Sequence, residues 1–329
     1  LTDNALAPAY AVFGLAAIMA FYESVGGMRS VVWTDMLQGI LLFIGAMGVI
    51  ISVLVLFENP FVLAQNLVQN PSPSWPPFTA RSWMTGFSTL ILFGLVIPLY
   101  PHVIQRIYAA RNIATLRTSF VLLTFTPFFI ILPIIVSAMA AGLILPPLAA
   151  GETDQVIPRL IDFLAREQPI MQIFSALFMA AVLAAIMSTM DSAMLSLGAV
   201  FNNDFIRPNF PHWSQAKLTR IGRALSWVLM FSMAYAALVF PQDIWSFILL
   251  QVDFLAQVFP ALAVGVLLPS VRARSVIIGL VTGLLTVLAL RYGLVSIDTM
   301  GIHAGLIGLV LNLTAVIGAH LLDQKNKFA

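Results

Sequence analysis

Long apolar stretches alternate with short polar segments along the whole of this 329-residue chain. Hydropathy separates nine such stretches, at residues 7–24, 35–57, 83–104, 118–145, 170–200, 220–240, 244–268, 274–292 and 302–322. Each is close to or above the ~20 residues that a helix needs to cross a hydrocarbon layer about 30 Å thick. The pattern predicts an all-α fold, a polytopic transmembrane helical bundle of about nine spans.

Glycine and proline mark several interruptions of this pattern. Gly26-Gly27 is expected to end the helix after the first span, and the proline-rich run 70–77 separates the second span from the third. Gly94 and Pro98 stand close together inside the third span. Because proline removes a helical amide and clashes with the preceding turn, we expect this helix to break or kink there. A break would expose backbone carbonyls of the kind that transporters use to hold substrates and ions.

Composition agrees with the bilayer as solvent. The chain is 60% hydrophobic and 9% charged, with a mean hydropathy of +0.98, whereas soluble domains have about 45–50% apolar and 25% charged residues. The formal charge is +2 and cysteine is absent. No basic cluster interleaved with aromatic residues and no protease, hydrolase or phosphate-binding motif occurs in the sequence. We therefore expect no nucleic-acid partner, and a protein that is not an enzyme.

Basic residues are unequally divided between alternate loops. One set of loops holds twelve of the sixteen, namely Arg29, Arg106, Arg111, Arg117, Arg207, Lys217, Arg220, Arg223, Arg272, Arg274, Lys325 and Lys327. The other set holds Arg81, Arg159, Arg166 and Arg291. Because Lys and Arg gather on the cytoplasmic side, this predicts a multi-pass plasma-membrane protein whose N-terminal end lies outside and whose C-terminus is cytoplasmic.

The fifth span carries a polar stripe. Ala185, Ser188, Thr189 and Ser192 recur at i, i+3, i+4 and i+7 and so share one helix face. Asp191 lies about 60° around the helix from Ser188. A hard cation such as sodium prefers neutral and anionic oxygens, which this face supplies. Close helix packing, with hydroxyls bonded back to the preceding turn, is the alternative explanation.

Two further groups of polar residues stand in or beside spans. Asp35 opens the second span, where a carboxylate can cap the helix or serve an ion. The seventh span contains Gln251, Asp253 and Gln257, of which the last two share a face. These side chains can line a substrate path or join helices through hydrogen bonds.

Three separated segments resemble signatures of the sodium:solute symporter family. They run from Gly26 to Gln38, from Pro101 to Arg106 and from Ala184 to Ser192. The resemblance covers essentially the whole chain and implies a leucine-transporter type of fold built from two inverted repeats. It further implies that residues 1–329 form one transmembrane transporter domain, corresponding to the fourth through twelfth core helices. The first three core helices of the same protein would then be a partner of this chain.

The resemblance also implies roles for individual residues. The family's conserved sodium site matches the Ala185 carbonyl and the hydroxyls of Ser188 and Thr189. The aspartate that some members use for a second sodium ion matches Asp35. Asp191 and Ser192 are further candidates for that second site, and the alternative role of Asp35 is in the exit of sodium to the cytoplasm.

The substrate-binding candidates come from the expected break and from the seventh span. They are Phe93, Val96, Ile97, Gln251, Asp253 and Gln257. Val96 stands about where sugar transporters of this family carry a gating tyrosine, which argues against a sugar. Leu99-Tyr100 stands where many members have Gly-Gln.

These features predict a sodium-coupled symporter in the lipid bilayer that imports a small organic solute by alternating access, with sodium ion as its bound cofactor. The alternative is a transporter-like membrane sensor domain of a signalling protein, because this family's membrane domain also occurs fused to histidine kinases.

Overall fold

The computed structural model describes residues 7–69, 79–146, 148, 152–167, 170–240 and 244–328, with side chains at 7, 27–30 and 325–328 excepted. Within these ranges the chain is helical and contains no strand. Nine helical stretches of the described chain are long and apolar enough to cross a membrane: Pro8–Gly26, Val31–Leu56, Ala80–Leu99, Ile113–Ile144, Ile170–Asn209, Gln215–Val239, Ile244–Leu267, Ala273–Arg291 and Ala304–Gln324. The predicted fold class is confirmed, with span ends shifted by up to five residues, except that the fifth span runs nine residues further, to Asn209.

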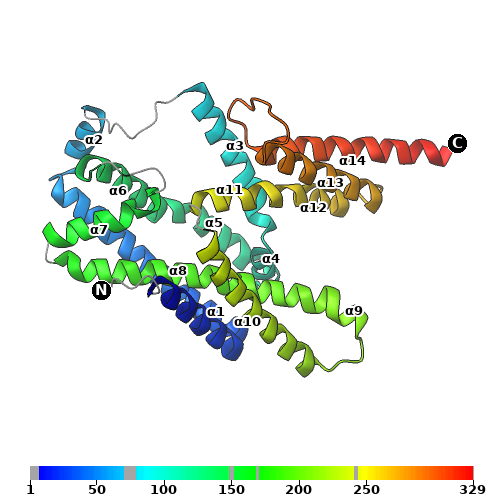
Figure 1. Cartoon of the computed structure of the whole chain (residues 1–329), viewed down its shortest axis with the longest axis horizontal. Coiled ribbons are helices and arrows are strands. Elements are labelled where there is room, and N and C mark those ends of the chain that lie inside the picture. The colour runs from blue at the N-terminus through cyan, green and yellow to red at the C-terminus, as the bar shows by residue number, and fades with distance from the viewer. Residues whose placement is uncertain are drawn as a thin grey trace. The chain divides into compact units, whose positions relative to one another are not determined.

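The chain divides into two compact units. Unit 1 comprises residues 1–75 and 105–241, and unit 2 comprises residues 76–104 and 242–329. Each is described by itself, with element labels as in Figure 1. The expectation that residues 1–329 act as one transport domain stays a prediction.

Unit 1 is built around two long helices. Its elements are α1 (Ala7–Leu56), α2 (Pro60–Gln69), the end of α4 (Pro101–Tyr108), α5 (Ile113–Phe129), α6 (Ile131–Ile144), η2 (Thr153–Gln155), α7 (Val156–Glu167), α8 (Ile170–Val200), the π-helical turn η3 (Phe201–Ile206), α9 (Arg207–Asn209) and α10 (Gln215–Val239). Both α1 and α10 pack against α8, as Figure 1 shows. Leu160 and Leu164 of α7 are completely buried against α6 and α8.

The helix α1 continues through Gly26-Gly27, where the sequence predicted an end. Tyr22 and Asp35 of α1 nevertheless contact Asp191 and Ser188, which lie within one turn of α8. Tyr22 and Asp35 are 13 residues apart, and a straight helix of that length rises about 20 Å. The element therefore bends sharply between the two contacts. The expected interruption takes the form of a bend, and glycine pairs are common places for one.

The second half of α1 runs antiparallel to α8. Gly45 lies against Phe178, and Ser52 donates a hydrogen bond to the sulfur of Met171. Residue numbers therefore increase along α1 in the direction in which they decrease along α8. A Cβ on Gly45 would lie 2.8 Å from the Phe178 ring. Small residues allow this close approach, which is how helices associate in lipid.

Unit 2 contains the predicted helix break. Its elements are α3 (Ala80–Val96), η1 (Ile97–Leu99), the start of α4, α11 (Ile244–Leu255), η4 (Ala256–Val258), α12 (Phe259–Leu267), α13 (Ala273–Arg291) and α14 (Ala304–Phe328). The α-helix of the third span stops at Val96, Pro98 lies in a 3-10 turn, and a new helix starts at Pro101. The break is confirmed, whereas the predicted interruption at 70–77 lies outside the described residues.

Candidate functional site

A polar cluster in unit 1 joins three helices through Asp35. Ser188 of α8 donates a hydrogen bond to one Asp35 carboxylate oxygen, and Arg106 of α4 donates to the other. The same Arg106 nitrogen also donates to the hydroxyl of Ser192, one helical turn beyond Ser188. Both oxygens of a carboxylate that is 15% exposed are therefore engaged, one by a hydroxyl and one by a cation.

Arg106 reaches this cluster because the short helix α4 is held on α8. The side-chain oxygen of Gln105 accepts a hydrogen bond of 3.1 Å from Ser196. Ser192 and Ser196 are one turn apart on α8, so α4 makes two polar contacts along that face. The charges of Asp35 and Arg106 balance, which makes a carboxylate at membrane depth less costly.

Asp191 points to a different neighbour. It is completely buried and accepts a hydrogen bond from the hydroxyl of Tyr22 on the first half of α1. Its other oxygen has no partner within the described part of the chain. Methionines 187, 190 and 194 pack around the same region. The 60° offset from Ser188 thus turns Asp191 away from the hydrogen bonds that surround Asp35.

The remaining members of the stripe behave differently from Ser188. The Thr189 hydroxyl donates to the Ala185 carbonyl at 3.1 Å, within its own helix, and the Thr189 side chain is exposed. This is the back-bonded arrangement that was the alternative to an ion site. The structure brings Asp35, Ser188 and Ser192 together and places no hydrogen bond between Thr189 and that group. The sodium roles of Ala185, Ser188, Thr189, Asp35, Asp191 and Ser192 stay predictions.

Asp253 and Gln257 of the seventh span join helices within unit 2. Asp253 is 1% exposed and accepts hydrogen bonds from Arg291 at 2.7 Å and from the Gly305 amide at 2.9 Å. Gln257 is fully buried and donates to the Gly305 carbonyl at 2.9 Å. Asn312 in turn donates to the Gln257 carbonyl. These contacts are of the helix-joining kind, and a role in substrate binding stays a prediction.

The other substrate candidates differ in burial and in their contacts. Phe93 stacks on Trp245 with ring centroids 6.1 Å apart, and Val96 is completely buried against Leu92. Ile97, in the 3-10 turn, and Gln251 are exposed. The break is present, and a role of these four residues in substrate binding stays a prediction.

Sequence reasoning missed two basic partners, Arg106 and Arg291. Arg106 entered only as a loop charge and as the last residue of a family segment, and Arg291 only as an outer charge. The available signal was that a carboxylate inside an apolar span needs a partner. Which basic residue serves each carboxylate depends on tertiary contacts, because Arg106 and Asp35 are 71 residues apart.

Comparisons with known proteins place these observations in a family. The fold is similar to that of a Na⁺-coupled sialic acid symporter solved in a substrate-bound outward-open state, with a TM-score of 0.76 and 21% identity, covering 97% of this chain and 68% of that one. The "Uncharacterized symporter YodF" of Bacillus subtilis is 24% identical over 94% of this chain and 61% of its own length. The human sodium/iodide cotransporter is 28% identical over 92% of this chain and 45% of its own length.

This chain thus spans about half to three-fifths of the length of these two relatives. Residues 5–283 match the model of the family described as sodium:solute symporter. That match covers most of the chain, including all three segments that carried the resemblance. The chain belongs to the sodium:solute symporter family.

Proposed function

We propose that the protein is a sodium-coupled symporter that imports a small organic solute across the plasma membrane by alternating access. One observation carries the ionic part of this proposal. The guanidinium of Arg106 is held by Asp35 and Ser192, so these oxygens already bind a group with a single positive charge. Asp35, Ser188 and Ser192 together provide anionic and neutral oxygens, the ligands that a hard cation prefers.

Sodium coupling follows from exchange of one cation for another. A sodium ion that takes the place of the Arg106 guanidinium beside Asp35 keeps the local charge unchanged. The displaced arginine is then free to move, and α4 can move with it. The helix α4 directly follows the break in the third span. A ligand shifts a conformational equilibrium only by binding one state better, and this exchange provides such a difference.

The comparisons support transport over the sensor alternative. The two relatives are named as a symporter and a cotransporter, and the similar structure is that of a Na⁺-coupled symporter. Sialic acid, the solute in that structure's description, is a small organic acid, which supports an organic solute here. We further propose that both units act as one transport domain, with the first core helices supplied by the same protein.

The proposed orientation rests on the basic residues. With the spans as the structure describes them, the same twelve of the sixteen lie at or near the loops after the first, third, fifth and seventh spans and after the last. We infer that these loops and the C-terminus are cytoplasmic and that the N-terminal end of the chain is outside. Cysteines introduced singly at 114 and 152 can be labelled from outside intact cells with a fluorescent reagent. Position 152 should react and position 114 should not. Labelling of position 114 alone would contradict this orientation.

The experiment that tests the proposal is solute uptake by the full-length protein in proteoliposomes, with and without an inward sodium gradient. Ser188→Ala and Thr189→Ala should each raise the sodium concentration for half-maximal uptake, by roughly tenfold for the hydroxyl that contacts Asp35. Ser119→Ala is the matched control, since its exposed hydroxyl only bonds back to Thr115. Uptake that needs no sodium, or unchanged sodium dependence in both variants, would refute the assignment.

A second measurement separates the two roles predicted for Asp35. If Asp35 binds a second sodium ion, Asp35→Asn should lower the number of sodium ions moved with each solute, measured from reversal potentials. If it serves sodium exit, the same variant should leave that number unchanged and slow uptake.

A further inference from the structure

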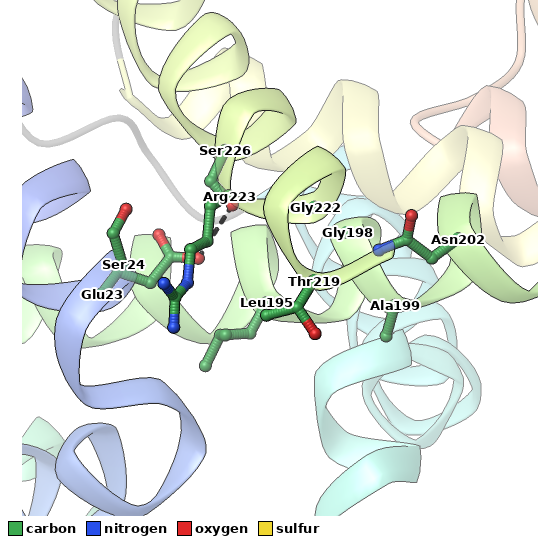
Figure 2. A pocket seen from close by; sticks show the side chains of 10 residues that line it. All are labelled: Glu23, Ser24, Leu195, Gly198, Ala199, Asn202, Thr219, Gly222, Arg223 and Ser226. Atoms are coloured by element: carbon green, nitrogen blue, oxygen red, sulfur yellow. Dashed lines mark hydrogen bonds between the residues drawn. The ribbon is translucent and has the colours of Figure 1, made fainter. Parts of the chain in front are cut away.

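A separate pocket of about 240 Å³ lies inside unit 1, between the first half of α1, the end of α8 with η3, and α10. Figure 2 shows Glu23, Asn202 and Ser226 among the residues that line it. None of the residues predicted to bind sodium lines this pocket. It includes Asn202 from a π-helical turn, a backbone form that is frequent at functional sites.

Two residues that line this pocket each have a buried oxygen without a partner in the described chain. Glu23 is 4% exposed; one of its carboxylate oxygens accepts a hydrogen bond of 3.0 Å from Ser226, and the other has no partner in the described chain. Asn202 donates through its amide nitrogen to the Leu218 carbonyl at 3.1 Å, which fixes the amide's orientation. Its side-chain oxygen is buried and, among the described residues, unpaired. A buried acceptor without a partner costs about 1–3 kcal/mol.

Two of the residues that line the pocket are glycines, Gly198 and Gly222. A Cβ on Gly198 would stand 3.9 Å from the Gly222 carbonyl oxygen and 4.0 Å from the Ser226 hydroxyl. Gly222 is the neighbour of Asn202, and Ser226 is the neighbour of Glu23. The side chains of Glu23 and Asn202 therefore meet α10 at positions about one helical turn apart, and the Asn202 amide nitrogen is the atom that faces Gly222.

The unpaired carboxylate oxygen of Glu23 defines the ligand's chemistry. It is an acceptor, so the ligand is a cation or a hydrogen-bond donor, and a single carboxylate balances a single positive charge. Divalent ions usually draw several carboxylates. Arg223 also lines the pocket, but its side chain is exposed and makes no ion pair with Glu23 among the described residues. We propose that this pocket binds a small monovalent cation through Glu23, at a site distinct from the Asp35 cluster.

The position of the pocket indicates how the cation reaches it. Glu23 is near the end of the span Pro8–Gly26, and Thr219 and Arg223 are near the start of the span Gln215–Val239. Both ends adjoin loops that the proposed orientation places in the cytoplasm. Access from the cytoplasm rests on that orientation, whereas the binding site itself rests only on the pocket.

Equilibrium binding of ²²Na⁺ and of ⁸⁶Rb⁺, a potassium substitute, to the purified full-length protein tests the proposal. Glu23→Gln keeps an acceptor for Ser226 but removes the charge, and Gly198→Ala places a methyl group in the pocket at ordinary contact distances. Both should weaken binding of at least one of the two ions by tenfold or more. Gly14→Ala, at a position with nothing within 4 Å, is the matched control and should bind normally.

The outcomes separate this site from the proposed coupling site. A component of binding that Glu23→Gln and Gly198→Ala remove and Ser188→Ala keeps supports the pocket, whatever happens to uptake. Unchanged binding of both ions in Glu23→Gln and Gly198→Ala would mean that the pocket holds water only, and would overturn the proposal. Loss in Glu23→Gln with full binding in Gly198→Ala would also overturn it, because the cation would then lie elsewhere.

Discussion

The close packing of α1 on α8 leads to a sharp prediction about Gly45. The substitution Gly45→Ala adds a Cβ that would stand 2.8 Å from the Phe178 ring and 3.2 Å from the Phe178 Cα, where ordinary contacts begin at 3.4 Å. The ring can rotate, but the backbone atom cannot. The two helices must therefore separate by a few tenths of an ångström at this level.

Two neighbouring glycines serve as graded controls on the same helix. At Gly48 the added Cβ would meet only the ring of Phe174, at 3.0 Å, so a side-chain movement relieves the contact. At Gly39 nothing lies within 4 Å. Overpacking of this kind costs about 1–3 kcal/mol, whereas an exposed Gly→Ala change in a helix gains up to about 1 kcal/mol. We expect stability in the order Gly39→Ala, Gly48→Ala, Gly45→Ala.

The assay is thermal unfolding of the purified protein in detergent at one fixed heating rate. Taking about 2 °C per kcal/mol for a chain of this size, Gly45→Ala should unfold roughly 2–6 °C below the parent protein. The same variant should need more sodium for half-maximal uptake, because Gly45 and Asp35 lie on one helix and separation at Gly45 loosens the Asp35–Ser188 contact. Equal unfolding temperatures for Gly45→Ala and Gly39→Ala would refute this packing of α1 against α8.

Two further predictions concern ion pairs in unit 2. Asp253→Asn should lower stability by about 1.5–3 kcal/mol, since it replaces the charged acceptor of Arg291, whose own side chain is 26% exposed, by a neutral one. By contrast, Arg81→Gln, at the exposed pair with Asp298, should leave the unfolding temperature unchanged. The backbone amide of Met300 and then the Arg81 guanidinium lower the pKa of Asp298. A depressed carboxyl pKa stabilises the folded state above the unfolded value of about 3.9 and loses that effect as pH falls below it. Protection of the Met300 amide from hydrogen exchange, corrected for the intrinsic pH dependence, should therefore be constant from pH 5 to 8 and fall below pH ~4; constant protection down to pH 3 would contradict this.

Hydropathy was sufficient for the nine spans because every backbone polar group in lipid must be satisfied within its own helix or barrel. The break after Val96 could also be predicted from the local sequence, since Pro98 cannot continue the α-helical hydrogen bonding. The bend in α1 was harder to predict. Gly26-Gly27 indicated where it falls, but whether the chain ends the helix or bends depends on the contacts of Tyr22 and Asp35 with α8.

The candidate site was predictable in part. The resemblance indicated that Asp35 and α8 oxygens work together, and Ser188 does contact Asp35. Helical periodicity could not distinguish Ser188 from Thr189, because both lie on the same face, yet one hydroxyl reaches another helix and the other bonds within its own. The pocket at Glu23 was not predicted, since it forms where three helices from distant parts of the sequence meet.

The bend in α1 also restricts how α8 can move. Two hydrogen bonds, from Tyr22 to Asp191 and from Ser188 to Asp35, hold one turn of α8 from two directions. Rotation of α8 about its axis would stretch both at once, whereas tilting of α8 together with α1 would preserve them. During a transport cycle these two helices should therefore move as one rigid body, and any twisting must take place in other segments.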